Sequence, residues 1–276
     1  MGQEFKNVKI NLNKLKEFVL ARKNPDGGFA FCKPLQSTLP ETFYAIFILK
    51  TIGERIPEEG KIVKFLKRSI RDDAYSIYWT YKSLSLLEKE LPDRSDFILE
   101  KLKEAIKAKR SGEIRAGGIT ATYSFAMPNV LREVFMLSEA LRLLGMEVPK
   151  FVSSFVKNFE KNGGFGLKRP NLEETYYCLS VLGFGNKRNL EFILKHENSE
   201  GFVKFPQSYP PYVEDTFYAL SCLKILGYKY KNRKIVDWIA ILQNADGGFR
   251  RSTYGGISTL ENSFYAVASL KLLEEL

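Results

Sequence analysis

The sequence predicts an all-α fold, an α6/α6 barrel built from six copies of a two-helix repeat. Three observations predict it: a pair of short phrases that recurs along the chain, similar spacing between the copies, and an alternation of amphipathic segments with segments that are apolar on nearly all sides. Self-similarity at a fixed period is the sequence signature of a repeat architecture. The 276 residues, 45% of them hydrophobic, are enough to bury one large core.

Each copy of the repeat joins a turn to the start of a helix. The turn carries glycine before an aromatic residue, since glycine adopts backbone angles that other residues avoid. The helix start carries an acidic residue, a small polar residue and aromatic residues. The clearest copies pair Pro25–Phe29 with Glu41–Ile46, Asn162–Phe165 with Glu174–Leu179, Glu200–Phe202 with Asp215–Leu220, and Gln243–Phe249 with Glu261–Val267, and a weaker one pairs Gly117–Ile119 with Glu133–Leu137.

The spacing of the copies gives their number. The second aromatic position of each helix start recurs at similar intervals, except that the step from Tyr44 to Met136 is twice as long as the others. A degenerate copy without a Gly-Gly turn fills this gap, with an amphipathic segment at 62–70 and an apolar one at 73–87. We therefore expect a single domain over residues 1–276, with repeats at about 12–53, 58–88, 97–145, 148–184, 187–227 and 232–276.

The two kinds of helix predict two concentric rings. A helix with one apolar stripe is peripheral, whereas a helix that is apolar all round is buried. Gly53, Gly145 and Gly227 follow the apolar segments and are typical helix ends. Six units can close on themselves and so remove the exposed ends of an open solenoid. An open superhelical array is the structural alternative, although it would not require so apolar a second helix.

The composition indicates which partners, location and source to expect for the protein. The net charge of +10 would attract an acidic partner, but most Lys and Arg lie in amphipathic stretches such as 64–68, where they form a solvated face. The longest purely apolar stretch, Phe43–Leu49, is too short for a transmembrane segment, and no nucleic-acid motif is present. Unpaired cysteine spacing and a polar start of the chain predict a cytoplasmic location. Abundant Lys and Glu with little Gln predict a thermophilic source.

The phrase Gln243-x-x-Asp-Gly-Gly-Phe249 followed by Phe-Tyr-Ala resembles the prenyltransferase and squalene cyclase repeat, with Phe249 where the cyclases usually carry Trp. The resemblance implies an α/α toroid with an apolar central cavity that holds an isoprenoid chain. It places the chemistry at the mouth formed by the N-terminal ends of the inner helices. The chain is closest in size to a protein prenyltransferase β subunit, and because those subunits work in heterodimers, the resemblance also implies a helical partner subunit.

If the inner helices run parallel, as in the family, polar residues of their first turns form a ring at one end of the barrel. Acidic residues in a first turn also complement the helix dipole, and capping explains Glu41, Glu174 and Glu261 well. Asp215 is different because Tyr212, three residues before it, cannot cap. The ring positions are Glu41, Glu133, Glu174, Asp215 and Asn262, with Glu173, Glu214 and Glu261 one residue earlier.

The family's zinc and diphosphate sites can be compared position by position. Where zinc-dependent members carry Asp, Cys and His, this chain offers acidic, aromatic and other polar residues, so we expect no zinc and no other cofactor. The diphosphate site is matched in part, by cations before Glu174 and a phenol after it, and a diphosphate would bring Mg²⁺. Lys168 and Arg169 are otherwise solvated loop charges. The predicted substrate-binding residues are Lys168, Arg169, Tyr177, Tyr218, Tyr265, Arg132 and Glu133.

Class II terpene cyclases protonate an alkene with the middle Asp of a D-x-D-D-T-A motif. The nearest phrase here, Tyr212–Ala219, keeps an acidic pair and the Thr but lacks the first Asp. Glu214 would be the acid and Asp215 its neighbour, and the predicted catalytic residues are Asp215, Glu214 and Glu174. Our leading hypothesis is a prenyltransferase-like protein that acts on an isoprenoid diphosphate. The alternatives are a class II cyclase-like enzyme and a non-catalytic lipid-binding or assembly module.

Overall fold

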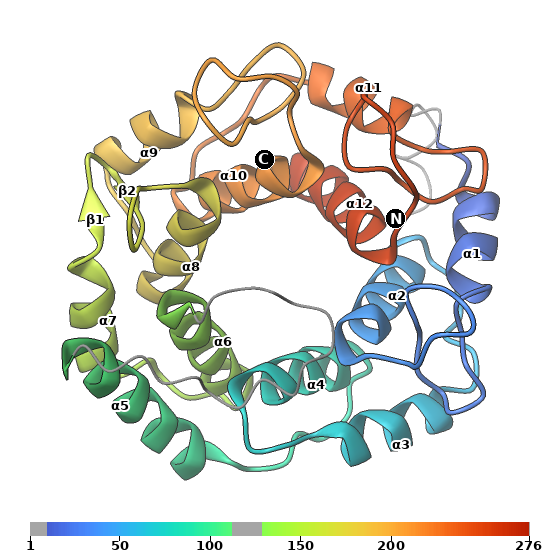
Figure 1. The fold of residues 1–276 in the computed structure, drawn as a ribbon, viewed down its shortest axis with the longest axis horizontal. Helices are drawn as coiled ribbons and strands as arrows, with labels where there is room; N and C mark the ends of the chain where they lie inside the picture. The colour runs from blue at the N-terminus through green and yellow to red at the C-terminus, as the bar shows by residue number, and fades with distance from the viewer. Residues whose placement is uncertain (1–9, 112–128, 276) are drawn as a thin grey trace.

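The computed structural model describes residues 10–111 and 129–275, and within them the helices form two concentric rings (Figure 1). The glycine turn expected at Gly117–Ile119 lies outside the described residues. The outer ring contains α1 (Leu12–Leu20), α3 (Glu59–Ser69), α5 (Ser95–Ser111), α7 (Lys150–Lys157), α9 (Lys187–Leu194) and α11 (Lys234–Ile241). The inner ring contains α2 (Leu39–Thr51), α4 (Ala74–Leu86), α6 (Val130–Leu143), α8 (Leu172–Leu182), α10 (Val213–Ile225) and α12 (Leu260–Glu275).

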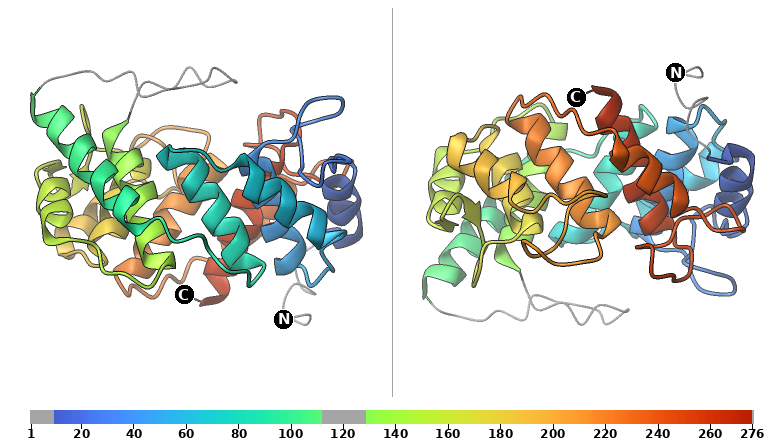
Figure 2. Two further views of the ribbon diagram at one scale, coloured as in Figure 1. Left: turned by 90° about the horizontal axis from the view of Figure 1, so that it is seen from below. Right: turned by 90° about the horizontal axis from the view of Figure 1, so that it is seen from above.

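The inner ring is closed. Each inner helix packs against the next one along the chain, and α12 packs against α2. The predicted α6/α6 barrel is therefore confirmed in preference to the open superhelix. The loops that precede the inner helices lie on one face of the ring, and the C-terminal end of α12 lies on the other, so the inner helices run parallel (Figure 2).

The burial of the two rings follows the sequence pattern. In the outer helix α3, the buried side chains are Ile62, Phe65 and Leu66, which form one stripe. In the inner helix α2, eight of the thirteen residues are buried, on every side of the helix. Helices of the first kind cover the core, while those of the second kind form it. None of the helices in the described ranges has the length and apolarity needed to cross a membrane.

The recurring phrases form a latch between each turn and its inner helix. The aromatic residue of the turn is fully buried, and its backbone N–H donates to the hydroxyl of the small polar residue in the helix start. Because both groups are buried, each satisfies a polar atom that water does not reach. The donor–acceptor distances are 3.0 Å for Phe29 and Thr42, 2.9 Å for Phe165 and Thr175, 3.1 Å for Phe202 and Thr216, and 3.0 Å for Phe249 and Ser263.

The glycine turns also set the distance between neighbouring repeats. Gly247 has φ +90°, and a Cβ there would lie 2.3 Å from the backbone of Lys14 in α1. The last repeat thus packs directly on the first, and the side chain of Gln243 bonds the backbone of Asn11 at 2.8 and 3.1 Å. One turn also forms a short hairpin of β1 (Glu160–Lys161) and β2 (Gly164–Phe165), which the sequence did not predict.

The inner helices end as expected. Gly53, Gly145 and Gly227 have positive φ angles of 79°, 77° and 64° at the ends of α2, α6 and α10. In the degenerate second repeat, Glu88 takes this left-handed position with φ 57°. The second repeat therefore keeps the geometry of the others although it has lost their glycines.

Candidate active site

The inner ring encloses a central cavity of about 2770 Å³ among the described residues. Its middle level is aromatic, and ring contacts pass from each inner helix to the next with centroid distances of 5.2 to 5.7 Å. We call this level the aromatic belt. It consists of Phe43, Tyr44, Tyr78, Trp79, Phe135, Met136, Tyr176, Tyr177, Phe217, Tyr218, Phe264 and Tyr265.

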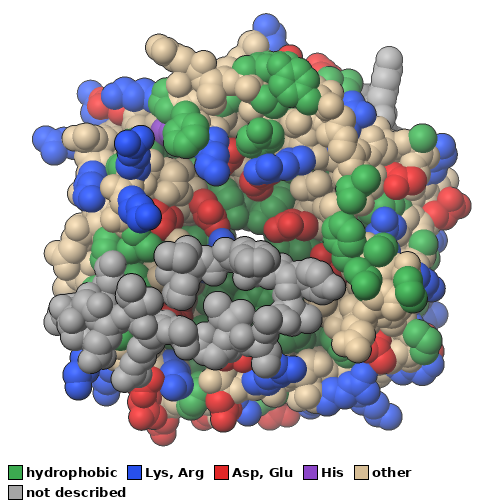
Figure 3. All heavy atoms as spheres, viewed as in Figure 1, with side chains coloured by type: hydrophobic (Ala, Val, Ile, Leu, Met, Phe, Trp, Pro, Cys, Tyr) green, Lys and Arg blue, Asp and Glu red, His purple; other side chains and the backbone are tan. Residues whose placement is uncertain are grey.

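Acidic side chains surround one opening of the cavity, at the first turns of the inner helices. Figure 3 views this face and shows carboxylates around the opening and basic side chains farther out. We call this group the acidic mouth. It consists of Glu41, Glu133, Glu173, Glu174, Glu214, Asp215 and Glu261, all of which line the cavity. The structure thus brings together the ring of first-turn residues that the sequence pointed to.

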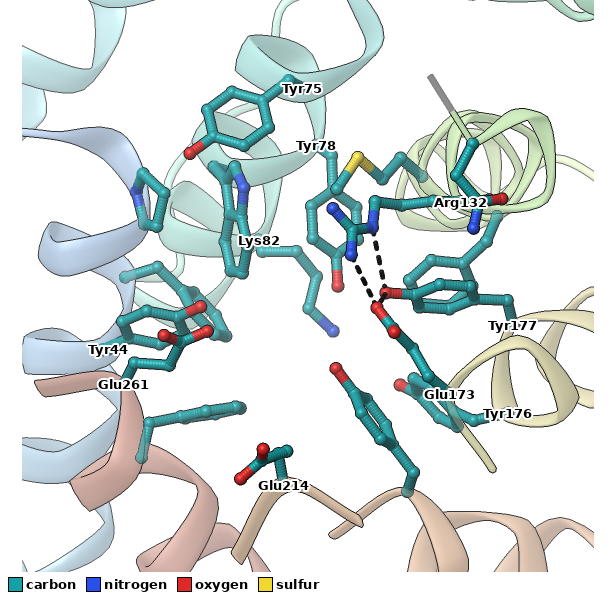
Figure 4. A pocket seen from close by; sticks show the side chains of 18 of the residues that line it. Tyr44, Tyr75, Tyr78, Lys82, Arg132, Glu173, Tyr176, Tyr177, Glu214 and Glu261 are labelled. Atoms are coloured by element: carbon teal, nitrogen blue, oxygen red, sulfur yellow. Dashed lines mark hydrogen bonds and ion pairs between the residues drawn. The ribbon is translucent and has the colours of Figure 1, made fainter. Parts of the chain in front are cut away.

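Arg132 and Tyr177, two predicted head-group ligands, are engaged by Glu173. The Glu173 carboxylate lies 2.6 Å from Arg132 Nη2 and accepts a 2.6 Å hydrogen bond from the Tyr177 hydroxyl. Arg132 Nε donates to the same hydroxyl oxygen at 3.2 Å. Burial and the nearby Glu173 raise the pKa of Tyr177, so its hydroxyl stays protonated. Figure 4 shows these three side chains on one wall of the cavity.

Glu214 is held by a cation from the loop that follows α11. Arg251 Nε lies 2.5 Å from Glu214 Oε1, and its guanidinium also lies over the ring of Tyr212, 4.1 Å from the centroid. The backbone carbonyl of Arg251 accepts from the N–H of Val213, which fixes this loop beside the start of α10.

Asp215, the next residue, is the most enclosed carboxyl without full hydrogen bonding. Its side chain is only 7% exposed, and its Oδ2 is buried with no hydrogen-bond partner. Tyr212 at the N-cap provides no side-chain cap, as the sequence indicated. Burial, and then the neighbouring Glu214, raise the pKa of Asp215 to about 7, although Lys204 and Arg251 lower it in part. This carboxyl therefore keeps its proton to a higher pH than an ordinary aspartic acid does.

Glu41 forms a second such carboxyl at the start of α2, which is separated from α10 in the inner ring by α12. Burial, and then Glu261, raise its pKa to about 7, and its Oε2 is buried without a partner. Burial also raises the pKa of Glu261, with a further contribution from Glu214, although the Glu261 side chain is open to the cavity. Thr259 provides the cap before α12, because its hydroxyl accepts from the N–H of Asn262.

Glu174 differs from these carboxyls because both of its oxygens accept hydrogen bonds. Oε1 accepts from Asn129 at 2.7 Å, and Oε2 accepts from the side chain of Asn171 at 2.7 Å and the backbone of Leu167 at 3.2 Å. These bonds tie α6, α8 and the preceding loop together. Burial raises the pKa of Glu133, which lies in the first turn of α6, and Lys101 of α5 offsets this in part.

The remaining predicted residues lie at the rim and in the belt. Lys168 and Arg169 are exposed on the loop before α8, where they line the cavity opening and have no ion-pair partner in the described ranges. Lys204 is a third exposed cation on this rim. Tyr218 and Tyr265 lie in the aromatic belt with their hydroxyl oxygens 3.0 Å apart.

The possible metal ligands lie apart from one another. Within residues 10–111 and 129–275, no group of three or more His, Cys, Asp or Glu side chains is placed to hold a metal ion. Burial raises the pKa of the thiols of Cys178 and Cys222, which disfavours the thiolate that a metal binds. His196 is buried beside α9, with Nδ1 2.9 Å from the carbonyl of Phe192.

Sequence reasoning missed several cations of the cavity, and Arg251 and Lys82 show why. Arg251 lies on a loop outside both recurring phrases, and only the fold brings it to Glu214. Lys82 lies in the degenerate repeat, and its side chain points into the middle of the cavity (Figure 4). The available signal was a lysine three residues after Trp79, where the clear repeats have Phe47, Ser180, Ser221 and Ala268.

The comparisons with known proteins agree with this architecture. The model of the family described as the prenyltransferase alpha-alpha toroid domain matches residues 1–77 and 183–276. A single-residue variant of the type II terpene cyclase MstE from Scytonema, in its apo form, is similar in structure, with a TM-score of 0.57 and 12% sequence identity. The similarity covers 95% of this chain and 94% of that one, and it concerns the fold. No curated protein matches the sequence.

Proposed function

Because the chain belongs to the prenyltransferase alpha-alpha toroid domain family, we propose that its cavity binds an isoprenoid chain and that Asp215 protonates an alkene of that chain. Protonation starts a ring closure, as in a class II terpene cyclase. The main support for this proposal is the buried carboxyl of Asp215 at the edge of an aromatic cavity. Its Oδ2 has no hydrogen-bond partner, and burial raises its pKa to about 7. A general acid works best when its pKa lies near the working pH.

The pairing of Glu214 supports Asp215 as the acid. Arg251 forms an ion pair with Oε1 of Glu214, whereas no cation among the described residues is bonded to the side chain of Asp215. The negative charge of Glu214 raises the pKa of Asp215 after the larger effect of burial.

The aromatic belt supplies what the next step requires. Proton transfer to an alkene forms a carbocation, and the electron pair of a second alkene then closes the ring. The faces of aromatic rings stabilise a cation within about 6 Å. Loss of a proton from the final cation completes the reaction, so the proton count is restored and no oxidant or reductant is required.

A second candidate function is the binding of a prenyl diphosphate for transfer to an acceptor. The observation that favours it is the exposed pair Lys168 and Arg169 at the rim, joined there by Lys204. Against it, Arg132 and Tyr177 are already engaged by Glu173. An α-helical partner subunit, implied by the prenyltransferase β subunits, belongs to this candidate.

The test is product analysis after incubation with farnesyl and geranylgeranyl diphosphate and their alcohols, in D₂O with a metal chelator. We expect a cyclised product that keeps its head group and carries one solvent deuteron. Asp215→Asn should lower turnover by about 10²- to 10⁴-fold, while Asp215→Glu should retain part of it. Activity should decline above about pH 7, where Asp215 ionises.

Three other results would replace the proposal. Full activity in both Asp215→Asn and Glu214→Gln would exclude this acid pair, and a loss in Glu41→Gln alone would move the acid to α2. Release of diphosphate, with binding that weakens in Lys168→Ala/Arg169→Ala, would favour the second candidate. Tight binding without any product would indicate a lipid-binding module.

A further inference from the structure

Beyond the aromatic belt, the far end of the cavity carries basic side chains. Lys82 of α4 lies one turn past Trp79, and Lys271 of α12 lies nearly two turns past Tyr265. Both line the cavity and are half-buried. The two helices flank α2 in the inner ring, so both lysines lie on the same side of the cavity.

These two lysines lack a carboxylate partner among the described residues. The contacts of their ammonium groups are with aromatic rings: Lys82 Nζ lies 6.0 Å from the centroid of Phe43, and Lys271 Nζ lies 5.7 Å from that of Phe47. Figure 4 shows the Lys82 side chain extended into the open centre of the cavity.

Other cations at this end of the barrel are paired. Lys224, which also lines the cavity, forms an ion pair with Glu275. Lys50 bonds Glu88 at 3.2 Å, and Arg142 bonds Glu139 at 2.7 Å. Cations near the C-terminal ends of helices are favoured by the helix dipole. The dipole accounts for Lys50, Arg142 and Lys224, which stand in the last turns of their helices, whereas Lys82 and Lys271 stand before the last turns of α4 and α12.

We propose that Lys82 and Lys271 bind an anionic group of the ligand, a carboxylate or a phosphate, at the end of the cavity away from the acidic mouth. The ligand is then an amphipathic isoprenoid whose chain crosses the aromatic belt. Seven residues separate Tyr75, in the first turn of α4, from Lys82, which corresponds to about 10 Å along the helix. The two lysines attract the anionic group to the far end, so the chain extends towards the acidic mouth and the alkene farthest from the anionic group meets Asp215.

This inference deepens the proposed function, and binding measurements test it separately from turnover. The probes are geranylgeranoic acid, geranylgeranyl phosphate and geranylgeraniol, which share one chain and differ in the head group. By calorimetry, the wild-type protein should bind the acid or the phosphate at least tenfold more tightly than the alcohol, a difference of about 1.4 kcal/mol. The two anionic probes show which head group the site prefers.

The variants locate the anionic group. In Lys82→Met/Lys271→Met, the preference for the anionic probes over the alcohol should fall to about one, while the affinity for the alcohol stays the same. Lys224→Met is the matched control, because Lys224 lines the same end of the cavity but is already paired, and it should keep the preference. The proposed function itself fails if these probes bind and no cyclised product forms, an outcome that leaves the binding result intact.

Four outcomes overturn the inference. The first is equal affinity of the wild-type protein for all three probes, which would leave the lysines as solvated charges in a wet cavity. The second is a preference that survives in Lys82→Met/Lys271→Met. The third is a preference that is lost instead in Lys168→Ala/Arg169→Ala, which would place the head group at the rim. The fourth is no binding of any probe.

Discussion

Replacing Asp215 by Asn should stabilise the protein more at pH 8 than at pH 4, relative to the wild-type protein. Replacing a carboxylate whose pKa is lowered by folding has the opposite pH dependence. Burial, and then Glu214, raise the pKa of Asp215 from 3.8 to about 7 in the folded protein. Between these pH values the native state holds a proton that the unfolded chain has released. The stabilising effect of that proton uptake is fully present below pH 3.8 and is lost as pH rises towards 7. The difference amounts to about 4 kcal/mol.

The Asp215→Asn variant carries a neutral amide at every pH and avoids this cost. Its stability relative to the wild-type protein should therefore increase by up to about 4 kcal/mol between pH 4 and pH 8. Thermal unfolding at both pH values measures it, since 1 kcal/mol shifts Tm by about 2 to 4 °C in a chain of this size. A stability difference that is the same at both pH values, or that favours the wild-type protein more at pH 8, would refute the reasoning.

Glu174→Gln is the control with the opposite sign. Both Glu174 oxygens accept hydrogen bonds, from Asn129, Asn171 and the backbone of Leu167. A glutamine can accept with one oxygen only and turns an amide group toward the remaining donors. We expect this variant to lose about 1 to 3 kcal/mol at pH 8. Equal losses of stability in the two variants at pH 8 would contradict this difference between the two carboxyls.

Three further predictions concern the latch, the ring closure and the acid. Thr216→Val, which leaves a buried backbone N–H without an acceptor, should lower the unfolding free energy by about 1 to 3 kcal/mol in a denaturant titration, whereas Thr216→Ser should lose much less. Gly247→Ala should lower Tm more than Gly53→Ala, because both glycines have positive φ but only Gly247 faces a neighbouring backbone. Arg251→Met should raise the pKa of Asp215 above about 7, since the guanidinium lowers it, and ¹³C NMR of the carboxyl would contradict this by a midpoint that stays or falls.

The sequence predicts the ring but only part of the site, and the reason differs from residue to residue. The recurring phrases mark the contacts inside one repeat, such as Phe202 with Thr216, so they predict the repeat and its closure. Asp215 was singled out because Tyr212 cannot cap it, a local argument that the structure confirms. The pairing of Arg132 with Glu173 joins two repeats, and no local pattern reports which side chains meet across that boundary.

The degenerate second repeat also contributes site residues that the recurring phrases could not predict. Its departures from the consensus place Tyr75 at the mouth and Lys82 deep in the cavity. A comparison of the recurring phrases disregards such departures, because it considers only the turn and helix-start residues that stabilise the fold. The positions that distinguish this cavity from that of another toroid are the ones that the repeat leaves free to vary. A site search in a repeat protein should therefore begin with its least regular copy.

The charge distribution along the cavity follows in part from a rule that acts on each helix separately. Acidic residues are favoured at the start of a helix and basic residues at its end, because the dipole places about half a charge of opposite sign there. In an isolated helix this arrangement is a matter of stability alone. In this cavity Lys224 follows the rule, because it stands in the last turn of α10 and is paired with Glu275. Lys82 and Lys271 do not follow it, because they stand before the last turns of α4 and α12. Helix stability therefore explains the acidic mouth and the paired cations, while the two lysines without a carboxylate partner in the described ranges are the ones that would give an anionic isoprenoid one preferred direction.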